Sequence, residues 1–215
     1  MTDLPAVQPT RDCSLCPRLA ALRHELRAQH PDWFNAPVPS FGDPNAALLI
    51  VGLAPGMKGA NRTGRPFTGD YAGVLLYETL IACGLAEGQY DERPDDGLTL
   101  KNCLISNAVR CLPPANKPTP EEMRNCLPFL RAQMEAMPRL KVVLALGRIA
   151  HDSVLTAMGL KRNGYAFGHG ARHALPAGPI LFDSYHCSRY NTQTRRLTPQ
   201  MFQAVIEAAV VELGR

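Results

Sequence analysis

Four short apolar runs, each followed by a segment with helical character, constrain the fold of this 215-residue chain more than any other feature. Runs of this length that are rich in Val, Ile and Leu are typical of buried strands in a parallel sheet. Alternation of strand and helix places helices on both faces of such a sheet. We therefore predict an α/β fold in three layers, α/β/α, around a central four-stranded parallel sheet. The runs are 47–53, 103–108, 142–147 and 179–184.

The helical segments carry their own boundary signals. Thr119, Pro120 and the acidic residues after them form a good helix N-terminus, and Gly84 ends an apolar helical segment. We find no internal repeat, so residues 1–215 are predicted to form a single domain. The expected helices are 17–29, 71–83, 119–137, 148–158 and 198–213.

Binding sites in open parallel sheets form outside the carboxyl ends of the strands. That rule indicates segments 52–70, 107–116 and 185–196, which are also the most unusual stretches of the sequence. We expect the functional residues to lie there.

Composition narrows the setting of the protein. The sequence has no apolar stretch of about 18 residues that could span a membrane, and its polar N-terminus lacks the apolar core of a secretory signal. A cytoplasmic location without membrane contact is expected. Residues 1–109 carry 9 Lys and Arg against 12 Asp and Glu, whereas residues 110–215 carry 14 against 7. The basic second half suits a polyanionic partner, although an ordinary solvated surface would give the same count.

Seven cysteines in such a chain argue against a disulfide framework and favour a metal site, buried thiols or both. Cys13 and Cys16 form a Cys-x-x-Cys pair, and Cys111 and Cys126 could complete four ligands. Zinc and an iron–sulfur cluster both accept four cysteines, and the spacing does not separate them. The other three, Cys83, Cys103 and Cys187, are interpreted as packing residues.

The loop GLAPGMKGANRTGRPFTGD, residues 52–70, follows the first apolar run directly. Its glycines allow a close backbone approach, but it contains neither a Walker motif nor a dinucleotide fingerprint. Phe67 offers a stacking surface for a planar ring, with a core residue as the plainer alternative. Asp70 is predicted to cap the helix that begins at residue 71 and could also hold a water or a cation.

These residues resemble the family 5 uracil-DNA glycosylases, the iron–sulfur branch of that superfamily. The resemblance rests on the loop at 52–70, on ISNAVRCLPPANKPTPEE at 105–122 and on HCSRYNTQTRRLT at 186–198, together with the Cys13/Cys16 pair. The neighbouring family 4 is similar, but it has a Glu where this chain has Leu53. The resemblance implies a 4Fe–4S cluster, bound by Cys13, Cys16, Cys111 and Cys126, that ties the N-terminal segment to the core.

The family resemblance also implies hydrolysis of the glycosidic bond of uracil, and of other deaminated bases such as hypoxanthine and xanthine, in DNA. A flipped base would stack on Phe67 beside Gly52, and Asn107 would read its edge. His186 would stabilise the base anion, in a protonation state that the sequence leaves open. Asp70 would stabilise the sugar cation and position water together with Asn116. No lysine need act as a nucleophile, so a monofunctional enzyme that leaves an abasic site is expected.

DNA contacts are predicted at five arginines, and a wedge into the DNA is expected in the third motif near Tyr190. Two departures from the family bear on this loop and on base preference: Cys187 replaces a usual proline, and the Gly56-Met57-Lys58 stretch is atypical. We expect a monomer. Rival interpretations are a non-catalytic iron–sulfur DNA-binding protein and a zinc-stabilised hydrolase of small nucleotides. The five arginines are Arg62, Arg65, Arg189, Arg195 and Arg196.

Overall fold

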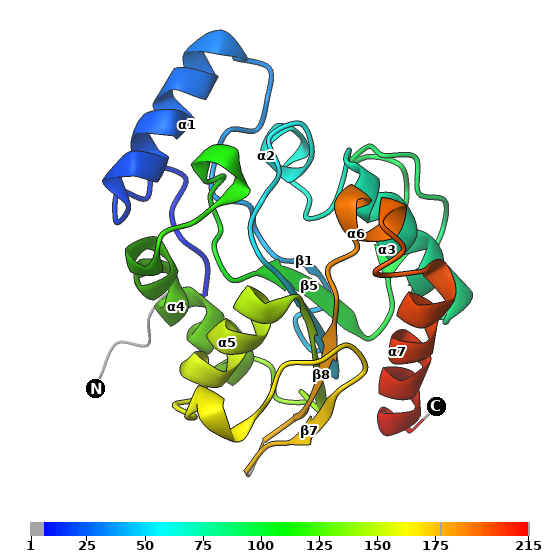
Figure 1. Cartoon of the computed structure of the whole chain (residues 1–215). Coiled ribbons are helices and arrows are strands. Elements are labelled where there is room, and N and C mark those ends of the chain that lie inside the picture. Colours follow the sequence, from blue (N-terminus) through cyan, green and yellow to red (C-terminus); the bar gives the residue numbers. More distant parts are fainter. Residues whose placement is uncertain (1–6, 177, 215) are drawn as a thin grey trace.

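A computed structural model describes residues 7–176 and 178–214 and shows a six-stranded sheet at the centre of the molecule (Figure 1). The strand order is β1-β5-β2-β6-β8-β7, and the four inner strands are parallel. The predicted α/β class and parallel sheet are therefore confirmed. The inner strands are β2 (Leu48–Gly52), β5 (Cys103–Asn107), β6 (Val142–Leu146) and β8 (Ile180–Ser184).

Two short antiparallel strands extend the sheet beyond the prediction. β1 (Phe41–Gly42) pairs with β5, and β7 (Arg172–Ala174) pairs with β8. Strands of two or three residues carry too little alternation of polar and apolar residues to be recognised in a sequence. A separate two-stranded sheet joins β3 (Ala86–Glu87) and β4 (Thr99–Leu100).

Helices cover both faces of the sheet (Figure 1). α3 (Tyr71–Ala82) and α7 (Pro199–Glu212) pack on one face, whereas α4 (Pro120–Glu135) and α5 (Arg148–Ala157) pack on the other. Strand β2 supplies both cores, because alternate side chains of a strand point to opposite faces. Leu48 and Ile50 join the first core and Leu49 and Val51 join the second.

Side-chain caps start three of these helices where the sequence indicates. Thr119 and Glu122 form a reciprocal capping box at α4, and Thr198 accepts a hydrogen bond from the Met201 backbone N–H at α7. Asp70 caps α3 in the same way. Helix α1 (Pro17–Gln29) lies at the edge of the molecule (Figure 1).

The loops at the carboxyl ends of the strands contain short helices. α2 (Ala60–Thr63) follows β2, the 3-10 turn η1 (Pro114–Asn116) follows β5, and α6 (Arg189–Gln193) follows β8. A further turn, η2 (Arg162–Gly164), follows α5. In the described part of the chain, no helix has both the length and the apolar character needed to cross a membrane.

Candidate active site

A cleft of about 390 Å³ opens where the carboxyl ends of β2, β5 and β8 meet their loops. This volume is within the range of small-molecule sites. Six residues predicted as site residues line it together: Phe67, Asp70, Asn107, Asn116, His186 and Arg189. The three segments that the sheet rule indicated therefore form one site.

Gly52 lies behind the cleft wall, at the last position of β2. It pairs in register with Asn107 on β5, and a Cβ atom at Gly52 would collide with Asn107 Oδ1 and with the Phe67 ring. The absence of a side chain is what allows the amide and the ring to meet. Gly52 thus shapes the site without lining it.

Asn107 lines the cleft and carries an acceptor without a partner in the described part of the chain. Its side chain is buried, and Oδ1 has no hydrogen-bond partner among the described residues. A buried amide oxygen without a partner costs free energy, on the order of 1–3 kcal/mol. The cleft is therefore suited to a ligand that donates a hydrogen bond to this oxygen.

Phe67 and His186 form an aromatic wall. Their ring centroids lie 5.8 Å apart with an interplanar angle of 29°. Phe67 has a left-handed backbone, with φ of 53°, and its carbonyl accepts a hydrogen bond of 3.1 Å from the Tyr90 hydroxyl. The same hydroxyl accepts one of 3.3 Å from the Gly69 N–H. Tyr90, which lies 23 residues further along the chain, thus holds the backbone from which the Phe67 ring projects.

Desolvation lowers the pKa of His186 to about 4. The imidazole is therefore neutral at physiological pH and can donate through one nitrogen only. A neutral donor stabilises a developing anion without first binding a proton. The backbone carbonyl of His186 accepts a hydrogen bond of 2.8 Å from the Asn191 side chain, which fixes the start of the third motif.

Asp70 both caps α3 and faces the cleft. Its carboxylate accepts a hydrogen bond of 3.3 Å from the Gly73 N–H, so the predicted cap is confirmed. Gly56 and Gly59 leave room for it, since a Cβ atom at Gly59 would collide with Oδ2. Burial raises the pKa of Asp70, against backbone hydrogen bonds that lower it. A partly desolvated carboxylate interacts strongly with positive charge that develops beside it.

Asn116 reaches the cleft from the turn η1. It has a left-handed backbone with φ of 56° and follows Ala115, which has φ of 52°. Asn is among the residues that adopt this conformation most readily. Asn116 is exposed to solvent and lines the cleft.

The prediction that Arg65 contacts DNA is wrong. Its guanidinium forms two hydrogen bonds with the Asp96 carboxylate, at 2.8 and 2.7 Å, and the two side chains are 5% and 0% exposed. The guanidinium also lies over the rings of Phe41 and Tyr77. The sequence misled because the pairing carboxylate is 31 residues away.

The other four predicted arginines are exposed and stay candidates for DNA contacts. Arg189 lines the cleft mouth and lies over the Tyr71 ring, whereas Arg196 lies over the Tyr185 ring. Tyr190 is 71% exposed, which is unusual for a large aromatic side chain. The four arginines are Arg62, Arg189, Arg195 and Arg196.

Among the cleft residues absent from the predicted set, Tyr71 and Ser188 carry polar side chains. Tyr71 follows Asp70 directly, at the first position of α3, and is 41% exposed. Ser188 caps α6 by accepting a hydrogen bond from the Asn191 N–H. Both lie in or beside the segments that the sheet rule indicated, which is the signal that could have found them.

A second pocket brings together the four predicted ligand cysteines: Cys13, Cys16, Cys111 and Cys126. Three sulfurs accept hydrogen bonds from nitrogen donors. The Arg110 backbone N–H donates to Cys126 at 3.3 Å, and the side chains of Arg23 and Asn125 donate to Cys111 and Cys16 at 3.8 Å. Burial raises the pKa of Cys111 to about 12 and that of Cys126 to about 11 when they carry no metal.

Two buried arginines that the sequence analysis missed border this pocket. Arg23 and Arg110 are 4% and 1% exposed, and neither forms an ion pair with a described carboxylate. Arg23 Nε and the Arg110 atoms Nε and NH2 have no hydrogen-bond partner in the described parts of the chain. Desolvation lowers the pKa of Arg110 to about 10. Buried cations of this kind require a nearby anion.

Comparisons with known proteins identify relatives over nearly the whole chain. A family model described as the uracil DNA glycosylase superfamily matches residues 39–210. A type-5 uracil-DNA glycosylase of Thermus thermophilus is 47% identical over 209 residues, which cover 94% of each chain. A type-5 enzyme of Pyrobaculum aerophilum is 39% identical and covers 94% of this chain and 90% of its own. A type-4 uracil-DNA glycosylase of Sulfurisphaera tokodaii is 29% identical over 80% of this chain and 74% of its own.

Proposed function

The chain belongs to the uracil-DNA glycosylase superfamily, and on that premise we propose that it removes uracil from DNA by hydrolysing the N-glycosidic bond. The observation that carries this proposal is the shared cleft, in which an aromatic ring, an unpartnered amide, a neutral imidazole and a carboxylate face one space. These are the groups that a flipped base and a departing sugar require.

The base enters the cleft beside Phe67. Its ring face stacks on the phenyl group, and a ring N–H of the base donates to Asn107 Oδ1, which has no partner in the described structure. Hypoxanthine and xanthine also carry a ring N–H beside a carbonyl. We include both purines in the proposed substrate range, since the same amide contact accommodates them.

Bond cleavage separates charge between the base and the sugar. His186, neutral because its pKa is about 4, donates a hydrogen bond to the base carbonyl and stabilises the leaving anion. The Asp70 carboxylate stabilises the sugar cation, and Asn116 on η1 helps to orient the attacking water. No lysine lines the cleft among the described residues, which supports a monofunctional reaction that ends at an abasic site.

The strand binds along the exposed arginines. Arg189, Arg195 and Arg196 contact phosphates from the third motif, and Arg62 does so from α2. Tyr190, on the same short helix as Arg189, inserts into the space that the flipped base vacates. We propose that the protein acts as a monomeric single domain, which is supported by one sheet that extends from residue 41 to residue 184.

We propose that the four-cysteine pocket holds a 4Fe–4S cluster, which the buried arginines beside it support. Such a cluster with four thiolates carries negative charge, and the unpaired nitrogens of Arg23 and Arg110 provide the compensating positive charge. Cys13, Cys16, Cys111 and Cys126 would hold it and thereby join the N-terminal segment to the loop after β5 and to α4. When bound, the cluster supplies cross-linking of these segments.

A base panel tests the proposal. Duplexes with one labelled uracil, hypoxanthine or xanthine are incubated with the protein and scored with and without alkali. We expect strand cleavage only after alkali, most strongly with uracil. The Asn107→Ala variant should lose most of this product, whereas Asn45→Ala, an exposed amide, should retain it. Salt-sensitive DNA binding without abasic product from any of the bases would instead identify a non-catalytic binding protein.

A further inference from the structure

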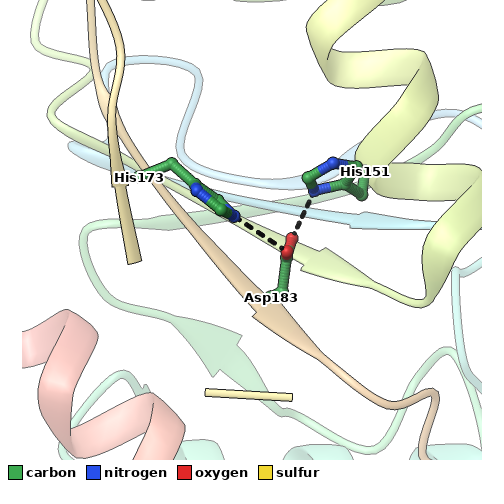
Figure 2. A group of neighbouring side chains, drawn as sticks. All are labelled: His151, His173 and Asp183. Carbon is green, nitrogen blue, oxygen red and sulfur yellow. Dashed lines mark hydrogen bonds and ion pairs between the residues drawn. The ribbon is translucent and has the colours of Figure 1, made fainter. Parts of the chain in front are cut away.

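Three metal-ligating side chains that the proposed reaction does not use meet on β8, outside the cleft (Figure 2). His151 comes from α5, His173 from the edge strand β7 and Asp183 from β8 itself. Their ligand atoms all lie within 4.8 Å of one another, and no other such group occurs in residues 7–176 and 178–214. One helix and two consecutive strands thus converge on one point.

The two imidazoles approach the Asp183 carboxylate from either side, as Figure 2 shows. His151 Nδ1 lies 2.7 Å from Oδ1, and His173 Nε2 lies 3.2 Å from Oδ2. Asp183 and His151 are fully buried, whereas the His173 side chain is 15% exposed. The group therefore has a buried floor and one side that solvent can reach, which gives an ion a path of entry.

The second nitrogen of His151 supplies the chemical constraint. Nε2 lies 3.0 Å from the backbone carbonyl of Tyr165, and a carbonyl oxygen only accepts hydrogen bonds. Nε2 therefore carries the hydrogen, and Nδ1 of a neutral imidazole then directs its lone pair at a carboxylate. A second proton on Nδ1, which makes the imidazole a cation, would satisfy this contact, and a metal ion is the other species that could. A histidine whose far nitrogen donates to a backbone carbonyl is the usual arrangement of a metal ligand, because that bond fixes the tautomer and the ring.

We propose that His151, His173 and Asp183 form a zinc-binding site, separate from the cysteine pocket and from the catalytic cleft. Two imidazole nitrogens and one carboxylate oxygen are a ligand set that zinc accepts, with water as the fourth ligand on the exposed side of His173. The ion would join β7 and α5 to β8 through His173, His151 and Asp183. Asp183 lies three residues before His186. A second proton on His151 would satisfy the same contacts, so the test must count metal ions.

Zinc content and zinc coordination test this site in the protein with its cysteine pocket loaded. The protein is dialysed against buffered zinc and then against metal-free buffer, and zinc and iron are counted in the same sample. We expect about one zinc per chain in the wild type. His173→Asn should lose that zinc with unchanged iron, whereas His24→Asn, which removes an exposed imidazole on α1, should keep it.

X-ray absorption at the zinc edge gives a second measurement that needs no variant. We expect nitrogen and oxygen neighbours at about 2.0–2.2 Å and no sulfur at about 2.3 Å. Three outcomes would overturn the proposal: a wild type that retains no zinc, zinc with sulfur neighbours, or equal zinc in wild type and His173→Asn. Each of these leaves the glycosylase proposal standing, because none of the three ligands lines the cleft.

Discussion

At the scale of the residue, the cleft depends on positions that have both a structural role and a role in the proposed chemistry. Asp70 starts α3 and faces the cleft, and Gly52 ends β2 while leaving room for Asn107 and Phe67. A substitution at such a position changes both activity and stability, unless the new residue keeps either the structural role or the chemical role. The most informative variants are therefore those that separate them.

Asp70→Asn makes this separation. Asparagine caps helices about as well as aspartate, so the free energy of unfolding should change by only a few tenths of a kcal/mol. The loss of the negative charge removes the stabilisation of the sugar cation, and single-turnover cleavage of uracil DNA should slow by about 10²-fold or more. Thermal melting and single-turnover rates check the two halves. A variant with wild-type rates would exclude the assigned role of this carboxylate.

The lowered pKa of His186 predicts how stability depends on pH. In the unfolded chain the imidazole titrates near its ordinary value of 6.5, whereas in the fold its pKa is about 4. Between these values the unfolded state binds more protons, so this residue's contribution to stability falls as the pH falls from about 6.5 to 4. His186→Asn should show a shallower decrease in melting temperature over that range. An identical decrease in both proteins would contradict the assignment.

At the scale of the element, sequence reasoning succeeded where periodicity was long and failed where pairing was distant. The run at 103–108 and the helix at 71–83 correspond to Cys103–Asn107 and Tyr71–Ala82, within one residue at each end. The carboxyl-end rule for parallel sheets indicates the segments that hold Phe67, Asp70 and Asn107, and these residues line one cleft.

What could not be foreseen has two physical causes. Edge strands β1 and β7 are too short to carry a pattern, and they exist because β5 and β8 offer them backbone groups to pair with. The role of Arg65 depends on Asp96, whose position relative to the loop is set by the tertiary fold. A charged residue is expected at the surface from its sequence, but it can be buried when the fold brings an oppositely charged residue beside it.

Arg65 and Arg196 offer a matched comparison of buried and exposed arginines. Arg65→Gln leaves Asp96 buried without its cation and should destabilise the fold by about 3–5 kcal/mol. Arg196→Gln should leave stability within about 0.5 kcal/mol of the wild type but weaken DNA binding and reduce its salt dependence. Urea unfolding and binding titrations at several salt concentrations measure both effects. Equal destabilisation by the two substitutions would refute the distinction.

At the scale of the whole molecule, the N-terminal segment is joined to the rest of the chain by a small apolar cluster and by polar contacts with α4. Leu19 packs with Val109 and Cys126, and Arg18 pairs with Glu122 at 2.7 Å with a partly exposed side chain. The carboxylate of this pair is 6% exposed and accepts two hydrogen bonds from Arg18, so the pair is stronger than an ordinary surface ion pair. Ligation by the four cysteines would add a further link between the start of α1, the loop after β5 and α4.

Removal of iron tests this link. Chelation under mildly oxidising conditions should raise amide hydrogen exchange in residues 7–29 strongly, because buried Arg23 and Arg110 lose their anionic partner. Exchange in β2, β5, β6 and β8 should change little, since both cores on the sheet remain intact. Unchanged exchange in residues 7–29 after complete loss of iron would show that the cysteine pocket does not hold α1 in place.

No residue of the stretch between β3 and β4 lines the cleft, yet this stretch supplies Tyr90 to the backbone of Phe67 and Asp96 to Arg65. The backbone that carries the stacking ring is thus supported by residues to which the proposed reaction assigns no contact with DNA. A substitution in this supporting stretch can shift the Phe67 ring and thereby change which bases are accepted. Every residue that contacts the base would then stay the same.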